Sequence, residues 1–325
     1  MRRATLLLLV LSAALIAGCG AKKQEGRAAY HWPATPEQLQ KLRKMPRAER
    51  EAWFANADLP RYDARKRDGA IKIDGLLDEA AWKKAQVITL SNGEAGGGEV
   101  RYATRVRMLW DDSAIYLAFE CDDPDVHQPL TKHDDPLWQH DLVEVFIDPD
   151  GDGASYMELH VAPSGAMSDS IYADFGPDAD WFAIPNWKRF AGSTTYTAFD
   201  AKGMTSAVRI DGTLNKPDDT DRGYVVEWRI PYSDLVNVVR DVAKSKHPID
   251  VSLFEQRPIE KPGATTMLDL GTIWRMNFNR CDDSIKLTTK DAKGKLVNVP
   301  EYSAWVPTTG SFHMPFLFGR VIFVH

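Results

Sequence analysis

The clearest hydrophobic pattern in the chain is an alternation with a period of two residues at 141–147. Glu144 shares one face of this segment with apolar side chains, and three β-branched residues occupy the other face. A period-2 run rich in β-branched residues predicts a strand with at least one buried face. The Asp/Gly-rich run at 148–153 is typical of a tight turn, so residues 156–162 are expected to return as the partner strand.

Alternating segments of similar length recur from residue 67 to the C-terminus. Further strands are expected at 70–74, 105–110, 115–121, 165–171, 187–190, 195–199, 224–230, 249–255, 274–280 and 316–324. Their spacing of roughly ten residues, with turn residues between them, is typical of an all-β domain. We therefore predict a two-sheet antiparallel β-sandwich over residues 67–325.

The first 66 residues follow a different pattern. Residues 1–18 combine a charged start, an apolar stretch and small residues before Cys19, which indicates a bacterial lipoprotein signal peptide. This signal predicts diacylglycerol on Cys19, and the alternative is an ordinary secretory peptide with a coincidental cysteine. Residues 19–66 are predicted to be a tether with one short helix at 35–54. No other stretch reaches the roughly 18 apolar residues of a membrane span, so membrane contact is expected through the lipid anchor only.

Charge limits the class of partner. The net charge is −6, and removing residues 1–18 takes away two arginines and leaves −8. An acidic chain without a basic run argues against nucleic acid as a partner. Two further cysteines, Cys121 and Cys281, lie in strand-like stretches, where they either pair in an oxidising envelope or remain buried thiols.

Several ordered blocks of sequence resemble carbohydrate-binding module family 9. The blocks are Ile-Asp-Gly-Leu-Leu-Asp-Glu-Ala-Ala-Trp at 73–82, the strand pair at 106–119, Trp-Gln-His-Asp-Leu-Val-Glu-Val-Phe-Ile-Asp at 138–148, Tyr-Val-Val-Glu-Trp-Arg-Ile-Pro at 224–231 and Phe-Gly-Arg-Val-Ile at 318–322. The resemblance implies a jelly-roll-like β-sandwich of the kind often attached to xylan- or cellulose-degrading enzymes. An insertion near 255–300 departs from the family pattern.

The resemblance also implies a sugar-binding site. Two tryptophans of the family clamp a terminal sugar ring, and they match Trp138 and Trp305 here. Glu144 matches an acidic residue that accepts hydrogen bonds from sugar hydroxyls. The family's polar pair on the next strand falls on His160 and Ala162, so His160 alone keeps a polar side chain. Sugar faces stack on aromatic rings while the hydroxyls need polar partners; rim packing for the tryptophans and structural roles for Glu144 and His160 are the alternatives.

Arg275 and Asn277 are two weaker candidates for sugar binding. Both lie on a polar strand within the insertion. A structural ion pair explains Arg275 equally well.

Calcium is a second ligand to consider. Asp148, Asp150 and Asp152, followed by glycine, imitate the start of a calcium-binding loop. The twelfth position is Leu159 and the flanks are predicted strands, which excludes an EF-hand. Because members of the resembling family carry calcium, a structural Ca²⁺ is one expectation and a plain Asp/Gly-rich hairpin is the other. The same two interpretations apply to a second acidic cluster at 122–125.

An enzymatic function is the main alternative to binding. A glycoside hydrolase needs two carboxyl groups across a cleft, and the best pair in this chain is Glu144 with Asp169 or Glu158. The chain lacks a nucleophile elbow, a zinc-protease motif, a phosphate loop and a dinucleotide fingerprint.

A haem-binding sandwich is the third candidate. Met108, Met157 and His160 lie in predicted strands and supply the side chains that such a site uses. The chain has no Cys-x-x-Cys-His sequence, and methionines at alternating strand positions usually belong to a core.

The sequence thus predicts a membrane-anchored protein that binds oligosaccharide or polysaccharide in carbohydrate catabolism. Glycan ends or short oligosaccharides of the xylan or cellulose type are the expected ligands. Gly20 follows the lipidated cysteine in place of an inner-membrane Asp signal, so the expected location is the outer membrane.

Overall fold

The computed structural model describes most of the chain after residue 58. The described residues are 58–93, 97–148, 156–173, 194–196, 200–235, 273–283, 288–291, 293–308 and 312–325, besides Pro46 and Glu49. The chain forms two units, residues 1–30 and 31–325, and the fold below belongs to the second. The signal peptide, Cys19, most of the predicted helix at 35–54 and the predicted strands at 187–190 and 249–255 lie outside the described residues.

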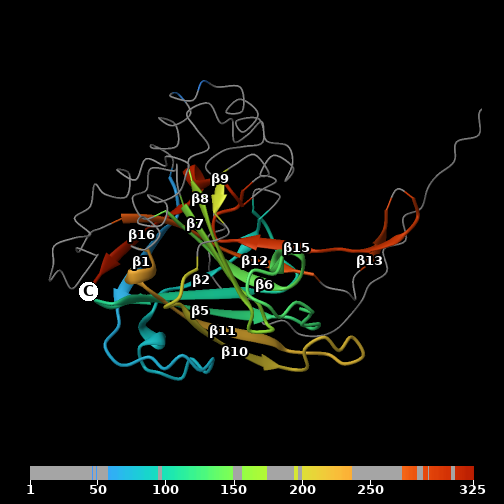
Figure 1. Ribbon diagram of the computed structural model, residues 1–325, viewed down its shortest axis with the longest axis horizontal. Coiled ribbons are helices and arrows are strands. Elements are labelled where there is room, and N and C mark those ends of the chain that lie inside the picture. Colours follow the sequence, from blue (N-terminus) through green and yellow to red (C-terminus); the bar gives the residue numbers. More distant parts are fainter. Residues whose placement is uncertain are drawn as a thin grey trace, which may run out of the picture. The chain divides into compact units, whose positions relative to one another are not determined.

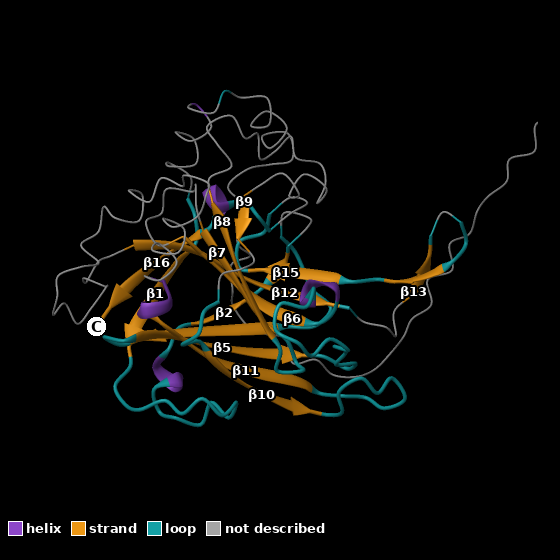
Figure 2. Ribbon diagram, in the orientation of Figure 1, coloured by secondary structure: helices purple, strands orange, loops and turns teal. Residues whose placement is uncertain are grey.

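Strands make up nearly all of the regular structure (Figure 1). They are β1 (Arg61–Lys66), β2 (Val87–Thr89), β3 (Ser91–Asn92), β4 (Thr104–Trp110), β5 (Ala114–Asp122), β6 (Leu142–Asp148), β7 (Tyr156–Val161), β8 (Met167–Ala173), β9 (Thr194–Tyr196), β10 (Thr205–Asp211), β11 (Gly223–Pro231), β12 (Ile273–Asp282), β13 (Thr288–Lys290), β14 (Leu296–Asn298), β15 (Glu301–Ala304) and β16 (Gly319–Val324). The short 3₁₀ turns are η1 (Trp82–Lys84), η2 (Leu137–Gln139) and η4 (Pro315–Leu317). Figure 2 shows how little helix the described part contains, and for these residues the prediction of an all-β fold is confirmed.

The hydrogen-bonded order of the main sheet is β10-β11-β5-β4-β1-β16-β12-β6-β7-β8-β9, with β2, β3 and β15 attached beside this path. These strands form one curled 14-stranded sheet, and β13 and β14 form a separate two-stranded sheet. The prediction of purely antiparallel sheets is wrong at β1, which pairs in parallel with both β16 and β4. Hairpin signals are local, whereas β1 pairs with β16 more than 250 positions later, so alternation alone does not predict this pairing.

Residues 61–66 were predicted to be the end of a tether, yet they form a central strand. Tyr62 and Ala64 are fully buried, although the strand reads Arg-Tyr-Asp-Ala-Arg-Lys. The Tyr62 hydroxyl donates to the carbonyl of Gln86 and accepts the N–H of Met108, both at 2.7 Å. This strand contributes to the core through only two side chains, which is too short a pattern to stand out in the sequence.

The largest hydrophobic cluster of the described residues combines side chains from strands in both halves of the sheet order. Val145 of β6, Phe119 of β5, Trp228 of β11 and Phe278 of β12 all belong to the same buried cluster. The Phe119 and Phe278 rings meet edge to face with centroids 6.3 Å apart. Strands from both halves therefore bury their apolar faces against each other, as in β-sandwich-type folds.

Residues 73–82 are held on the sheet by hydrogen bonds to Glu227 of β11. Glu227 accepts hydrogen bonds from the backbone N–H groups of Asp74 and Gly75 and from Trp82 Nε1, each at 2.9 Å. Gly75 has a φ of +80°, and a Cβ there would lie 3.1 Å from Arg209 Cβ. Glycine, the buried carboxylate and the indole together hold this loop on the sheet.

The segment at 255–300 is predicted to be an insertion relative to the family pattern, and its described centre forms β12, a strand of the main sheet. β12 pairs with β6 on one side and with β16 and β15 on the other. Arg280 of β12 is 1% exposed and its Nη2 lies 2.7 Å from Asp123 Oδ2 and 3.2 Å from Asp282 Oδ2. Arg105 Nη2 lies 2.6 Å from Asp122 Oδ1. Arginines thus supply positive charge to the acidic cluster at 122–125.

Both described cysteines are buried free thiols. Cys121 and Cys281 therefore follow the second of the two sequence-based interpretations. Among the described residues, no helix combines the length and apolarity needed to cross a membrane.

Candidate functional site

Trp138 is presented to solvent on the short turn η2. Its side chain is 55% exposed, whereas the preceding Leu137 is fully buried. Gln128 Nε2 donates to the carbonyls of Leu137 and Asp141, at 3.2 and 2.9 Å, and so fixes both ends of the turn. The local fold thus holds an indole outward at the entrance to β6.

A polar row crosses four strands next to this turn. Asn279 of β12 is in register with Glu144 of β6, Glu144 with His160 of β7, and His160 with Ser168 of β8. Side chains in register on neighbouring strands share one face of the sheet. The period-2 alternation therefore places these four polar groups on the face opposite the hydrophobic core.

His160 lies between two carboxylates. Its Nε2 is 3.0 Å from Glu144 Oε2 and 3.0 Å from Glu158 Oε1. Its Nδ1 is 2.9 Å from Ser168 Oγ. Exposures of 2%, 7% and 4% for Glu144, Glu158 and His160 show that the three groups form a buried network. The expected proximity of Glu144 and His160 is thus present, with Glu158 as a third member.

The three ionisable groups of this network shift one another's pKa values. Burial by itself lowers the pKa of His160, but the neighbouring Glu158 and Glu144 outweigh burial and raise this pKa to about 10. For Glu158, burial is outweighed by His313 and His160, which lower its pKa to about 2. Burial raises the pKa of Glu144. The favoured state is an imidazolium–carboxylate pair between His160 and Glu158.

Aromatic groups extend the network beyond the residues that the sequence suggested. Tyr156 and Tyr172 stack with centroids 5.1 Å apart and an interplanar angle of 8°. The Tyr156 hydroxyl lies 2.8 Å from Nδ1 of His313, whose Nε2 is 3.9 Å from Glu158 Oε1. The two tyrosines lie at alternating strand positions, so the sequence pattern could have placed them on one face of the sheet. Nothing in the sequence predicts that His313, more than 150 positions away, lies near Glu158.

Trp305 has a different environment from Trp138. It is 8% exposed and lies in the hydrophobic core. Its ring packs against Phe278 and Tyr62, with centroids 5.4 and 6.3 Å away. This burial contradicts the expectation that Trp305 and Trp138 clamp a sugar between two exposed rings.

Asn277 and Arg275 lie on β12 as expected, but Asn277 is occupied by the backbone. Its Nδ2 donates to the carbonyl of Val306 at 3.0 Å, and its Oδ1 accepts from the N–H of Val306 at 2.9 Å. Asn277 is fully buried and therefore pins the segment after β15 to β12. Arg275 is half-buried and in register with Asp148 of β6.

The calcium expectation falls largely outside the described residues. Asp148 is buried at the end of β6, whereas Asp150 and Asp152 are not described. The calcium interpretation of this turn therefore stays a prediction.

The two alternative functions are affected differently by the structure. Asp169 lies on the face opposite Glu144, 3.6 Å from His133 Nε2, so this carboxylate pair of the hydrolase hypothesis is not brought together. Glu144 and Glu158 do meet, but both are bound to His160. Met108 and Met157 belong to the core cluster while His160 faces the other side of the sheet, so the haem-ligand set does not converge.

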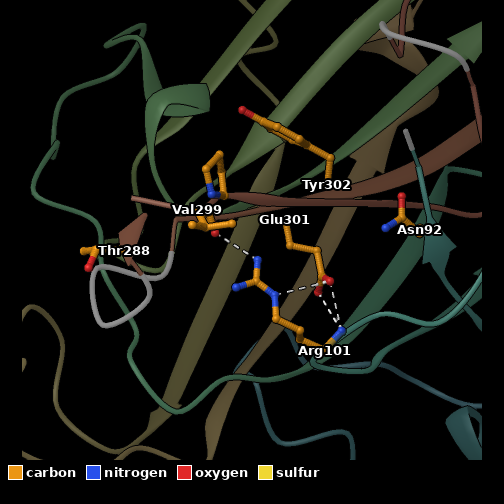
Figure 3. Close-up of a pocket in the computed structure, with 7 residues that line it drawn as sticks. Asn92, Arg101, Thr288, Val299, Glu301 and Tyr302 are labelled. Carbon is orange, nitrogen blue, oxygen red and sulfur yellow. Dashed lines mark hydrogen bonds and ion pairs between the residues drawn. The ribbon is translucent and has the colours of Figure 1, made fainter. Parts of the chain in front are cut away.

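A pocket of about 440 Å³ opens beside β15 (Figure 3). Its lining residues are Asn92, Arg101, Thr288, Val299, Pro300, Glu301 and Tyr302. Figure 3 shows Arg101 between Glu301 and the carbonyl of Val299; its Nη2 donates to that carbonyl at 2.9 Å, and its backbone N–H donates to Glu301 Oε2 at 2.9 Å. Tyr302 also packs against the apolar cluster that contains Leu137, the neighbour of Trp138.

Comparisons with known proteins bear on the same part of the chain. Residues 73–170 match the family model described as "Carbohydrate family 9 binding domain-like". The chain is 29% identical over 167 residues to Exoglucanase XynX of Acetivibrio thermocellus, covering 51% of this chain and 12% of that protein. It is 31% identical over 90 residues to Endo-1,4-beta-xylanase A of Thermotoga neapolitana, covering 28% of this chain and 8% of that protein. The chain thus matches only a small part of the length of these curated relatives.

Among solved structures, a candidate carbohydrate-binding protein from Bacteroides uniformis has the same fold. The alignment has a TM-score of 0.50 at 15% identity and covers 82% of this chain and 99% of that chain. The matched segment at 73–170 contains Trp138, Glu144 and His160. The part of the chain that carries the candidate site is therefore similar to the family 9 carbohydrate-binding domains.

Proposed function

We propose that this chain binds carbohydrate by stacking a sugar ring on Trp138. The observation that carries the proposal is the 55% exposure of this indole within the segment that matches the family model. The exposed large apolar side chains of the described part are Leu76, Trp138 and Leu296, so Trp138 is the aromatic one among them. An exposed tryptophan on a short turn provides an apolar face for a pyranose at little cost in conformational entropy.

The buried network lies on β6 and β7, and Leu137 of η2 packs in one cluster with Leu142 of β6. Glu144 and His160 already bind each other, so in this proposal they fix the shape and charge of the sheet face while stacking supplies most of the affinity.

The ligand class follows from the relatives. They are named as an exoglucanase and an endo-1,4-β-xylanase, and the matched segment makes up 12% and 8% of the two proteins. We infer that the ligands are ends or short stretches of glucan or xylan chains, captured for carbohydrate catabolism. Binding needs no proton transfer, so no catalytic residue is assigned.

Calorimetric titration of the full chain with xylose, glucose, xylobiose and cellobiose tests this function. A tryptophan side chain of about 250 Å² that is 55% exposed offers about 70 Å² on one ring face, worth about 1.7 kcal/mol at about 25 cal/mol per Å². Trp138→Ala is therefore expected to weaken binding roughly 20-fold. Leu76→Ala, which removes another exposed apolar side chain from the matched segment, is the control and should bind as the wild type does.

Two results would contradict the proposal. Absence of heat with every sugar from a folded protein would exclude small-sugar binding. Binding that survives Trp138→Ala but is lost in Tyr302→Ala would move the site to the pocket beside β15 and remove the role of Trp138.

We also propose that diacylglycerol on Cys19 tethers this binding domain to the outer membrane. The support is the lipoprotein-type signal in residues 1–18 and the glycine after Cys19. Expression of the full chain in a Gram-negative host should place it in the outer-membrane fraction, and mass spectrometry should find the lipid on Cys19. Cys19→Ala should release the chain from that fraction; a membrane-bound variant, or an unmodified Cys19, would refute the tether.

A further inference from the structure

Two histidines and an aspartate meet at a place that the proposed sugar site does not use. His127 follows β5, His140 follows η2 directly, and Asp283 follows β12 directly. His140 Nδ1 lies 2.9 Å from Asp283 Oδ2, and the two imidazole rings meet edge to face with centroids 5.1 Å apart. One ligand atom from each of the three side chains lies within 4.8 Å of the other two.

A buried carboxylate holds the backbone of this cluster. Asp141 is fully buried, and its Oδ2 accepts the N–H of His127 at 2.6 Å. Its Oδ1 accepts the N–H of Asp283 at 2.7 Å. The segments that carry His127 and Asp283 are thus joined through one side chain, whatever the imidazoles bind. Such fixed support is what a metal site requires of the residues behind its ligands.

The ring of His127 has an unused coordinating atom. Its Nδ1 is inaccessible to solvent and has no hydrogen-bond partner among the described residues. Buried polar atoms are nearly always paired, so a buried imidazole nitrogen without a partner needs an explanation. Both carboxylate oxygens of Asp283, by contrast, have partners. Its Oδ1 accepts from Asn298 Nδ2 at 3.2 Å, and its Oδ2 lies 2.9 Å from His140 Nδ1.

The donor set selects the kind of metal. Two imidazoles and one carboxylate suit Zn²⁺, whereas Ca²⁺ prefers a shell of oxygen atoms. Ligands of one tetrahedral Zn²⁺ lie about 3.3 Å apart, and the candidate atoms lie within 4.8 Å of one another, so a ring shift of at most about 1.5 Å brings them to coordination distance. Rotation about χ2 of histidine supplies such a shift, because this torsion is broad. The side chains of His140 and Asp283 are 23% and 14% exposed, which leaves a path for the ion and for a water as fourth ligand.

We propose that His127, His140 and Asp283 bind one Zn²⁺ ion, which cross-links the segment after β5, the end of η2 and the end of β12. The ion would fix the turn that presents Trp138, two residues before His140. The zinc site does not depend on sugar binding, and its test contains no sugar.

The test is titration of the full chain, freed of metal with a chelator and dialysed, with ZnCl₂ in a non-coordinating buffer. We expect one Zn²⁺ per chain, a rise in Tm on saturation, and with Co²⁺ the visible absorption of a tetrahedral site. His127→Ala and His140→Ala should each weaken Zn²⁺ binding at least about tenfold, and Asp283→Asn should weaken it as well. These substitutions keep the backbone N–H groups that bind Asp141, so near-ultraviolet circular dichroism should show a preserved fold.

His325→Gln is the matched control, because this exposed C-terminal imidazole lies outside the cluster and should leave Zn²⁺ affinity unchanged. A folded chain that shows no saturable Zn²⁺ binding would overturn the proposal. Equal affinity in wild type, His127→Ala and His140→Ala would overturn it too, as would loss of binding in His133→Gln alone, since His133 belongs to a separate cluster with Asp169 and Asp200. Displacement of Zn²⁺ by an equimolar amount of Ca²⁺ would also exclude an imidazole site.

Discussion

Replacing Trp305 with alanine separates a core role from a sugar-clamp role. The side chain is 8% exposed, so about 200 Å² of its surface is buried, and burial of that area stabilises the fold by about 5 kcal/mol at about 25 cal/mol per Å². Trp→Ala substitutions in cores cost about 3–5 kcal/mol. We expect Trp305→Ala to lower the free energy of unfolding by about 4 kcal/mol and Tm by about 10 °C.

The assay is urea unfolding followed by fluorescence and circular dichroism, with Trp138→Ala as the matched control. Trp138 is 55% exposed, so its removal should change the free energy of unfolding by less than about 0.5 kcal/mol. Sugar affinity should show the reverse order, with Trp305→Ala close to wild type wherever it remains folded. A Trp305→Ala variant that keeps wild-type stability but loses sugar binding would refute the burial argument and restore the clamp.

A neighbouring glycine provides a second test of the same packing. A Cβ on Gly319 would lie 2.5 Å from the ring of Trp305. Gly319→Ala alone should therefore destabilise the protein through a steric clash, whereas adding it to Trp305→Ala should cost much less. A double-mutant cycle measures this coupling, and additive free energies would show that the ring does not fill the space above Gly319.

Three further predictions concern buried polar groups and thiols. Arg280→Met should lower the free energy of unfolding in urea by about 3–5 kcal/mol, because it leaves buried carboxylates without a counter-charge. Arg105→Ala, at a half-buried ion pair, should lower it by about 1 kcal/mol or less. Equal losses in the two variants would contradict the buried network. The pKa of His160 is raised to about 10, so the protonated imidazole stabilises the fold fully below about pH 6.5, and this stabilisation is lost as the pH rises towards 10. His160→Gln should therefore make the free energy of unfolding less dependent on pH over this window. An unchanged pH dependence would contradict the ion network. Burial raises the pKa of Cys121 to about 11, so it and Cys281 should react with Ellman's reagent only after denaturation, and prompt labelling of the native protein would show that the thiols are accessible.

Short-range patterns in the sequence predicted the strands around the candidate site well. The alternation at 141–147 and 156–162 corresponds to β6 and β7, and the hairpin between them places Glu144 in register with His160. A hairpin joins residues close in sequence, so its pairing follows from alternation and turn residues alone. The exposure of Trp138 agrees with its place outside that alternation.

Long-range contacts explain what the sequence did not predict. Trp305 is buried because Tyr62, more than 240 positions earlier, lies against its ring. Asn277 resembles a free polar group in the sequence, yet the backbone of Val306 occupies its amide. A resemblance between sequence blocks transfers residue types, but it does not transfer the burial that decides whether an aromatic ring meets solvent or core.

The sequence by itself determined the class of the fold and the strands of the β6–β7 hairpin, because period-2 alternation and turn chemistry act over a few residues. Only the tertiary structure decided that β1 lies between β4 and β16, that both faces of β6 are buried, and that His127, His140 and Asp283 meet. Each of these features includes at least one contact between segments more than a hundred residues apart in the sequence. Such segments associate because they bury a shared core. An alternating strand can expose its second face to solvent or bury it against other parts of the protein. The environment of that face therefore depends on the tertiary structure and not on the local pattern.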